Sequence, residues 1–261
     1  MSAFADVRKA AWDTETTGPN PLEDRIVTAA FVVRGGGRED RVFSWLINPG
    51  IPIPAEASAV HGVTDAMVQA DGQDPKTALD EIATNLLRAA AWGMPIVAFN
   101  HSFDWSILHY DLKRNGLPTV EDRLAEYADS APLPLLDPHV IDRQCVPRLR
   151  GKGQRKLKPT AERYGVTLTD WHTAEADALA ALLITEAQFE RFPQLDLMGP
   201  QQLFAAQRAW RAEQQTGLRE WFRTQATPEQ AADPERSFDG SWPLIPAPRE
   251  GDTTTRQEGL L

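Results

Sequence analysis

Three acidic segments, far apart in the sequence, restrict the folds that are open to this chain. Asp13 and Glu15 lie at the end of an apolar run typical of a buried strand, and residues two apart on a strand point to the same side. Asp104 follows the short apolar run 95–99, and Asp177 lies in an Ala- and Leu-rich helical stretch. A fold that uses these groups together must therefore bring two strand ends and a helix to one edge of a sheet.

Side-by-side carboxylates are unfavourable unless a cation neutralises them, and hard oxygen ligands favour Mg²⁺ or Mn²⁺. Alone, the pair Asp13 and Glu15 is weak evidence, since an acidic turn after a strand has the same pattern. His172, five residues before Asp177, completes the set that a two-metal phosphodiesterase requires. Acidic groups bind both ions, and a histidine accepts the proton of the attacking water because its ordinary pKa lies close to neutral pH.

The three segments resemble the motifs of the DnaQ-like 3′→5′ exonucleases of the DEDDh type, typified by the proofreading epsilon subunit of bacterial DNA polymerase III. The first motif corresponds to residues 13–18, the second to Asn100-x-x-Phe103-Asp104, and the third to His172-x4-Asp177. Weaker matches cover residues 54–64, 151–157 and 161–166. The matches follow the family's order over about residues 6–190, which we expect to form the exonuclease domain.

The resemblance implies a metal-dependent 3′→5′ exonuclease that releases nucleoside 5′-monophosphates from DNA in proofreading, repair or end trimming. It implies a His172 base and two Mg²⁺ or Mn²⁺ ions, whose ligands are Asp13, Glu15, Asp104 and Asp177. The expected substrate is a single-stranded or frayed 3′ end. An exoribonuclease of the oligoribonuclease or RNase T type is the alternative, because the same motifs occur there. A non-catalytic binding module is disfavoured, because all five motif residues are present.

Four further residues are candidates for contacting the terminal nucleotide, namely Thr16, Glu56, His61 and Phe103. His61 and Phe103 also have structural interpretations, as a loop-stabilising residue and as part of the core. The segment 148–158 carries six cations and no acid, and it precedes His172. We expect it to contact substrate phosphates, although a solvated loop has the same composition. Asp137, Asp142 and Glu175 match no motif and are interpreted as surface groups or as groups behind the ligands.

The hydrophobic pattern predicts an α/β chain with a mixed five-stranded sheet flanked by helices, in agreement with the RNase H-like fold that the resemblance implies. The predicted strands are residues 9–13, 26–33, 41–47, 95–99 and 133–141. The predicted helices are residues 77–91, 106–115, 158–164 and 173–189. Gly35 to Gly37 predicts a turn between two antiparallel strands.

Composition gives weaker constraints. The net charge of −10 is unusual for a nucleic-acid enzyme, and we attribute part of it to carboxylates that a metal neutralises. A single cysteine, Cys145, excludes an internal disulfide. The sequence shows no apolar leader and no run long enough to span a bilayer, so we expect a cytoplasmic protein without membrane contact.

The C-terminal part is predicted to form a helical extension over residues 191–225 and a Pro-rich, irregular tail over 226–261. One or two helices are expected within 201–223. Gln194 to Met198 reads Gln-Leu-Asp-Leu-Met, which resembles the peptide with which bacterial replication proteins bind the sliding clamp. Five-residue motifs are common by chance, and both leucines can instead pack on the domain.

Overall fold

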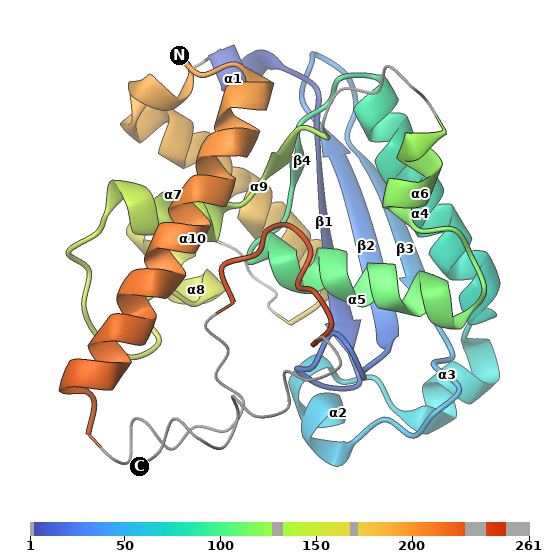
Figure 1. The fold of residues 1–261 in the computed structure, drawn as a ribbon. Helices are drawn as coiled ribbons and strands as arrows, with labels where there is room; N and C mark the ends of the chain where they lie inside the picture. The colour runs from blue at the N-terminus through green and yellow to red at the C-terminus, as the bar shows by residue number, and fades with distance from the viewer. Residues whose placement is uncertain (1–2, 127–132, 168–171, 228–238, 249–261) are drawn as a thin grey trace.

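A computed structural model describes residues 3–126, 133–167, 172–227 and 239–248. At its centre is a five-stranded sheet with the order β3-β2-β1-β4-β5 (Figure 1). The strands are β1 (Lys9–Thr16), β2 (Ile26–Arg34), β3 (Arg41–Leu46), β4 (Ile96–Val97) and β5 (Leu135–Leu136). β1 pairs antiparallel with β2 and parallel with β4, and β4 pairs parallel with β5. The predicted mixed sheet is therefore confirmed, as is the antiparallel pair β2–β3 around Gly35 to Gly37.

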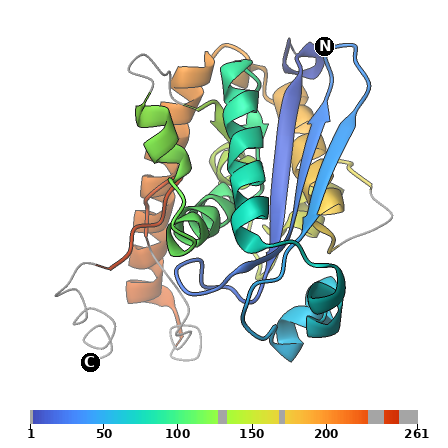
Figure 2. The ribbon, with the colours of Figure 1, turned by 90° about the vertical axis from the view of Figure 1, so that its right-hand side faces the viewer.

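Helices cover both faces of the sheet (Figures 1 and 2). α9 (Ala174–Arg191) packs on β1 and β2 from one side, and α4 (Pro75–Ala91) and α5 (His101–Arg114) lie on the other. This explains why β2 is apolar almost throughout, because a strand covered on both faces has no solvent-facing side. The remaining described helices are α1 (Ala3–Asp6), α2 (Ala55–His61), α3 (Asp65–Asp71), α6 (Val120–Ala125), α7 (Pro138–Cys145), α8 (Leu157–Arg163), the 3₁₀ turn Pro193–Leu195 and α10 (Pro200–Gln225).

The predicted strand over 133–141 is confirmed only at Leu135–Leu136 and is wrong from residue 137 onward. β5 ends at Leu136, and α7 begins at Pro138, so His139 lies in a helix. The carboxylate of Asp137 accepts hydrogen bonds from the backbone N–H of His139 (2.9 Å) and of Val140 (3.4 Å). An N-capping Asp followed by Pro starts a helix even where the apolar pattern favours a strand.

α5 begins five residues before the predicted start of its helix. Asn100, at the N-cap position, has a left-handed backbone (φ 61°), and the helix then starts directly at His101. Phe103 and Asp104 consequently lie in the first turn of α5 instead of preceding it. Both side chains are therefore positioned by a helix, which fixes their direction more firmly than a loop would.

The C-terminal extension forms one 26-residue helix, α10, which packs on α7 and β5. Its buried Gln207 accepts a hydrogen bond from the backbone N–H of Asp137 (2.7 Å) and donates one to the carbonyl of Leu135 (2.9 Å). Residues 239–248 have no regular secondary structure, yet they bury Trp242 against the domain. The parts 228–238 and 249–261 of the predicted tail lie outside the described residues. Among the helices that the structure describes, none is long and apolar enough to cross a bilayer.

Candidate active site

β1 presents its two acidic residues to the α9 side of the sheet. Trp12 and Thr14 contact α5, so the alternation of a strand turns Asp13 and Glu15 towards α9. Asp177, in the first turn of α9, meets them there. One carboxylate oxygen from each of Asp13, Glu15 and Asp177 lies within 4.8 Å of the others. The structure thus brings together three of the four predicted metal ligands.

Burial and like charges raise the pKa values of the carboxyl groups in this cluster. Burial, and then the charges of Asp104, Asp177 and Glu15, raise the pKa of Asp13 well above its usual range. Burial and Asp177 raise the pKa of Glu15 to about 7. Burial also raises the pKa of Asp177, and its Oδ1 is buried without a hydrogen-bond partner among the described residues. Oxygen-only donors with an unsatisfied oxygen fit a hard divalent cation such as Mg²⁺ or Mn²⁺.

Asp104 lies beside this cluster but is held differently. Its Oδ1 accepts hydrogen bonds from the backbone N–H (3.0 Å) and the hydroxyl (2.8 Å) of Thr14. Burial raises its pKa to about 7, against the lowering effect of the Thr14 hydrogen bonds. Asp104 does not belong to the set within 4.8 Å, although its charge acts on Asp13. Its role as a metal ligand therefore stays a prediction.

His172 is exposed and directly precedes Thr173, the N-cap residue of α9. It has a left-handed backbone (φ 65°), which a non-glycine residue rarely adopts. Its charge and its backbone N–H both lower the pKa of Asp177, so the residue lies close to the carboxylate cluster. An exposed imidazole close to Asp177 is placed where it can accept a proton from a solvent molecule.

Of the candidate nucleotide contacts, His61 is brought to Thr16 at the end of β1. The Nδ1 of His61 accepts a hydrogen bond from the backbone N–H of Val63 (3.1 Å). Burial lowers the pKa of His61, and the backbone of Thr16 partly opposes that shift. The hydroxyl of Thr16 donates to the carbonyl of Gly18 (2.7 Å). His61 therefore stabilises its own loop and also reaches the first motif.

The other two candidates differ in their surroundings. Phe103 is half-buried and packs against the main core, so core packing accounts for at least part of its surface. Glu56 is exposed on α2, a helix without a buried residue. The contact of either side chain with a nucleotide is untested and stays a prediction.

Asp137 and Asp142 are buried. The sequence interpretation placed both on the surface or behind the ligands. Asp137 accepts hydrogen bonds from the backbone N–H of Asn100 (3.0 Å) and of His101 (3.1 Å), in addition to capping α7. It therefore fixes the turn that carries the second motif. The Asp-Pro pair at 137–138 is a helix-start signal in the sequence, and it predicts that Asp137 caps a helix.

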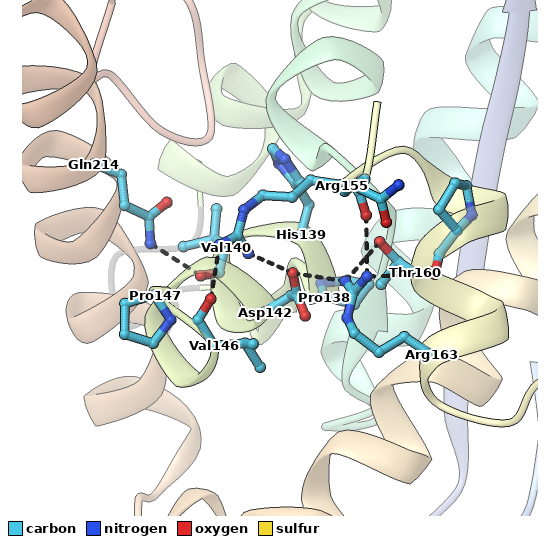
Figure 3. A network of polar contacts seen from close by, with 12 residues as sticks. Pro138, His139, Val140, Asp142, Val146, Pro147, Arg155, Thr160, Arg163 and Gln214 are labelled. Atoms are coloured by element: carbon cyan, nitrogen blue, oxygen red, sulfur yellow. Dashed lines mark hydrogen bonds and ion pairs between the residues drawn. The ribbon is translucent and has the colours of Figure 1, made fainter. Parts of the chain in front are cut away.

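Asp142 is the second buried acid, and it anchors the basic segment (Figure 3). Its carboxylate pairs with Arg155 (2.6 Å) and Arg163 (2.9 Å), and accepts a hydrogen bond from the hydroxyl of Tyr164 (3.0 Å). Arg155 also donates to the carbonyl of Val146 (2.7 Å). Arg155 is thus held within the protein, and the contact of the segment with substrate phosphates stays a prediction. The five cations of the segment that stay exposed are Arg148, Arg150, Lys152, Lys156 and Lys158.

The segment from Gln194 to Met198 is partly built into the domain. Leu195 is 1% exposed and belongs to the core that α9 and β1 share. Leu197 is 84% exposed. Only one of the two leucines is therefore accessible to a partner in this structure.

The site combines clustered carboxylates with an exposed histidine at the edge of a mixed sheet. This combination is typical of metal-dependent phosphodiesterases with an RNase H-like fold. A family model described as an exonuclease of the RNase T type matches residues 11–185. The chain therefore belongs to the DnaQ-like 3′→5′ exonuclease family. This confirms the family expected from the sequence.

Two curated relatives illustrate the membership. The chain is 33% identical over 193 residues to a DNA polymerase III subunit epsilon-like protein of Rhodobacter capsulatus, covering 72% of this chain and 24% of that protein. It is 31% identical over 186 residues to the 3′-5′ exonuclease DinG of Bacillus subtilis, covering 70% and 18%. The chain thus spans about a quarter or less of the length of these relatives.

Solved structures confirm the RNase H-like fold. Escherichia coli exonuclease I in complex with a dT13 oligonucleotide superimposes with a TM-score of 0.60 at 18% identity. The superposition covers 73% of this chain and 42% of that one. At this level of identity the likeness concerns the fold.

Proposed function

We propose that the chain hydrolyses DNA from single-stranded or frayed 3′ ends and releases nucleoside 5′-monophosphates. The observation that carries the proposal is the cluster of Asp13, Glu15 and Asp177, whose carboxylate oxygens lie within 4.8 Å of one another. Family membership supplies the reaction class, and the cluster supplies the chemistry that such a reaction requires.

Each residue has a defined task in this proposal. Asp13, Glu15 and Asp177 would hold divalent cations, with Asp104 as the fourth ligand. When bound, such ions lower the pKa of a water molecule and stabilise the leaving 3′ oxygen. An imidazole nitrogen of His172 accepts the proton of the attacking water.

The remaining candidate residues would orient the 3′ end. Thr16 and His61 meet at the end of β1, and Phe103 and Glu56 are on the neighbouring α5 and α2. A base can stack on an aromatic side chain such as Phe103, and Thr16 and His61 can hydrogen-bond to the terminal nucleotide. The five exposed cations of 148–158 would attract the phosphate backbone, with Asp142 fixing one end of their segment.

The preference for DNA over RNA is argued from the relatives. Proteins named for DNA polymerase III are among the curated matches, and exonuclease I has been solved with DNA oligonucleotides. An exoribonuclease is the alternative, because discrimination of a 2′-OH depends on contacts that the motifs do not specify.

The direct test follows 5′-labelled DNA and RNA oligonucleotides of matched sequence with Mg²⁺, Mn²⁺ or EDTA. We expect a ladder that shortens from the 3′ end on DNA and disappears with EDTA. Asp104→Ala is the inactive control, and Glu220→Ala on the exposed face of α10 is the matched active one. Shortening of RNA alone would establish the ribonuclease, and binding without shortening of either strand would refute the enzyme.

Three further proposals accompany this function. The exonuclease domain spans residues 6–190, followed by a helical extension over 191–225 and a tail over 226–261. A cytoplasmic location fits a DNA substrate and the single Cys145. A sliding-clamp contact through Gln194 to Met198 requires Leu195 to leave the core. No saturable binding of a peptide spanning 192–204 to a bacterial clamp would rule it out.

A further inference from the structure

We propose that His101 is a positioning residue of the active site, and that the C-terminal segment 239–248 completes its surroundings through Trp242. This assignment rests on the proposed exonuclease activity and adds a residue that matches no motif position. His101 follows the left-handed Asn100 and is the first residue of α5. Its side chain is fully buried, so its contacts are all with the protein.

Both nitrogens of the His101 ring have partners on different strands. The indole N–H of Trp12 on β1 lies 3.1 Å from Nε2, and the carbonyl of Leu136 on β5 lies 3.2 Å from Nδ1. An indole N–H can only donate, so Nε2 must accept and Nδ1 must carry the proton. Burial lowers the pKa of His101 to about 4, which agrees with a neutral ring. The contacts therefore specify one tautomer.

These contacts fix β1 against α5 on both sides of Asp13. Trp12 bonds to His101, and Thr14 bonds to Asp104, which lies three residues further along α5. The two links flank Asp13 in the sequence, and His101 and Asp104 lie about one turn apart. Loss of the first link would allow Asp13 to shift relative to Asp104, the fourth predicted ligand, and so change how the carboxylates together hold a metal ion.

Three tryptophan rings surround His101. Trp12, Trp105 and Trp242 lie with ring centroids 5.9, 6.0 and 6.2 Å from it, all in edge-to-face arrangements. Trp242 comes from the segment that crosses α5 (red in Figure 1), and it is 4% exposed. Without Trp242, water would reach the His101 ring and compete with Trp12 and Leu136 for its nitrogens.

Hydrogen bonds hold this segment on α5. The backbone N–H of Ile245 donates to the hydroxyl of Ser106 (2.8 Å), and its carbonyl accepts from the hydroxyl of Tyr110 (2.9 Å). Phe204 on α10 packs on Trp242 with ring centroids 5.2 Å apart. A segment that follows the motifs by more than sixty residues is thereby part of the structure that positions them.

Two substitutions at His101 separate positioning from simple stability. His101→Leu removes both hydrogen bonds, whereas His101→Gln keeps one acceptor and one donor. We expect His101→Leu to lower kcat and to weaken Mn²⁺ binding, measured by calorimetry, by about 10- to 100-fold each, with KM nearly unchanged. His101→Gln should recover most of both losses. Phe189→Ala, a core truncation beside Phe4 at the opposite end of the sheet, should lower Tm without altering kcat or Mn²⁺ affinity.

Trp242 provides the second test, should the leucine variant fail to fold. Trp242→Ala should lower kcat and Mn²⁺ affinity in the same direction, Trp242→Phe should do so less, and Trp92→Ala, at an exposed tryptophan, should do neither. A folded His101→Leu or Trp242→Ala variant with wild-type kcat and Mn²⁺ affinity would overturn the proposal.

An NMR measurement is independent of activity. The long-range ¹H–¹⁵N spectrum should show His101 as the Nδ1–H tautomer, and the Nε2–H tautomer would contradict the contacts on which we rely. If the wild-type chain cleaves no nucleic acid, the proposed function fails. The tautomer and the Mn²⁺ affinities would still decide whether His101 positions the carboxylates.

Discussion

At the scale of single residues, the proposed site gathers like charges, because the carboxylate oxygens of Asp13, Glu15 and Asp177 lie within 4.8 Å of one another. Asp13 is the centre of this repulsion, because the charges of Asp104, Asp177 and Glu15 all raise its pKa. The same repulsion that destabilises the metal-free fold strengthens the binding of a divalent ion. Function and stability therefore make opposite demands on this residue.

Asp13→Asn tests this opposition. We expect the substitution to abolish nuclease activity and to raise the Tm of the metal-free protein by about 2–4 °C, the shift that corresponds to 1 kcal/mol in a chain of this size. Thermal unfolding in EDTA provides the measurement. Asp80→Asn, at an exposed position on α4, is the matched control. A lower Tm for Asp13→Asn in EDTA would show that the carboxylate stabilises the fold.

His172 offers a second prediction at this scale. Replacing it with Gln should lower kcat by about 10²- to 10⁴-fold, since a general base typically contributes that much. Metal affinity should change much less than kcat, because the residue is exposed and is not part of the carboxylate cluster. Single-turnover rates together with Mn²⁺ titration separate the two effects. An unchanged rate would remove His172 from the mechanism.

At the scale of elements, ion pairs buried between helices hold the basic segment in place. Asp142 on α7 is fully buried and binds Arg155, and Arg163 on α8 binds the same carboxylate (Figure 3). Removing one partner of a buried pair is costly because the other charge is left uncompensated. This junction therefore determines where the exposed cations of 148–158 lie.

Asp142→Ala should destabilise the protein by about 3–5 kcal/mol, the usual cost of breaking a buried ion pair. Glu220→Ala, which removes an exposed pair with Arg223, should change stability by less than about 1 kcal/mol. Urea denaturation of both variants provides the comparison. An equal change in the free energy of unfolding for both variants would mean that water solvates Arg155 and Arg163 once Asp142 is removed.

The sequence predicts features that arise from neighbouring residues better than features that arise from contacts between distant residues. Asp13 and Glu15 are recognisable because strand alternation alone places both on one side. The contact between His101 and Trp12 is different, since it joins residues 89 apart through side chains that match no motif. The helix α7 was missed because an apolar pattern was given more weight than the local cap at Asp137.

At the scale of the whole molecule, the chain is acidic, with a net charge of −10. The ionisation of its buried carboxyl groups makes the stability of the fold depend on pH and on bound metal. Burial raises the pKa values of Glu15 and Asp104 to about 7, whereas unfolded carboxyl groups titrate near 4. The folded chain therefore binds more protons than the unfolded chain between these values. The contribution of these two carboxyl groups to stability thus falls as the pH rises from about 4 to about 7.

A divalent cation should oppose this loss, because it binds the ionised carboxylates. We expect the Tm in EDTA to fall between pH 5 and pH 8, and the rise in Tm on adding Mg²⁺ to be larger at pH 8. Scanning calorimetry at both pH values gives the comparison. A metal effect of equal size at both pH values would contradict the link.

The measurement that tests the site most directly is an anomalous difference map from crystals of the protein grown with Mn²⁺. We predict a peak in contact with the carboxylate oxygens of Asp13, Glu15 and Asp177, at about 2.0–2.2 Å, and its loss in crystals of the Asp13→Asn variant. A map with no peak among these three residues, from crystals that are saturated with Mn²⁺, would contradict the metal site and the mechanism built on it.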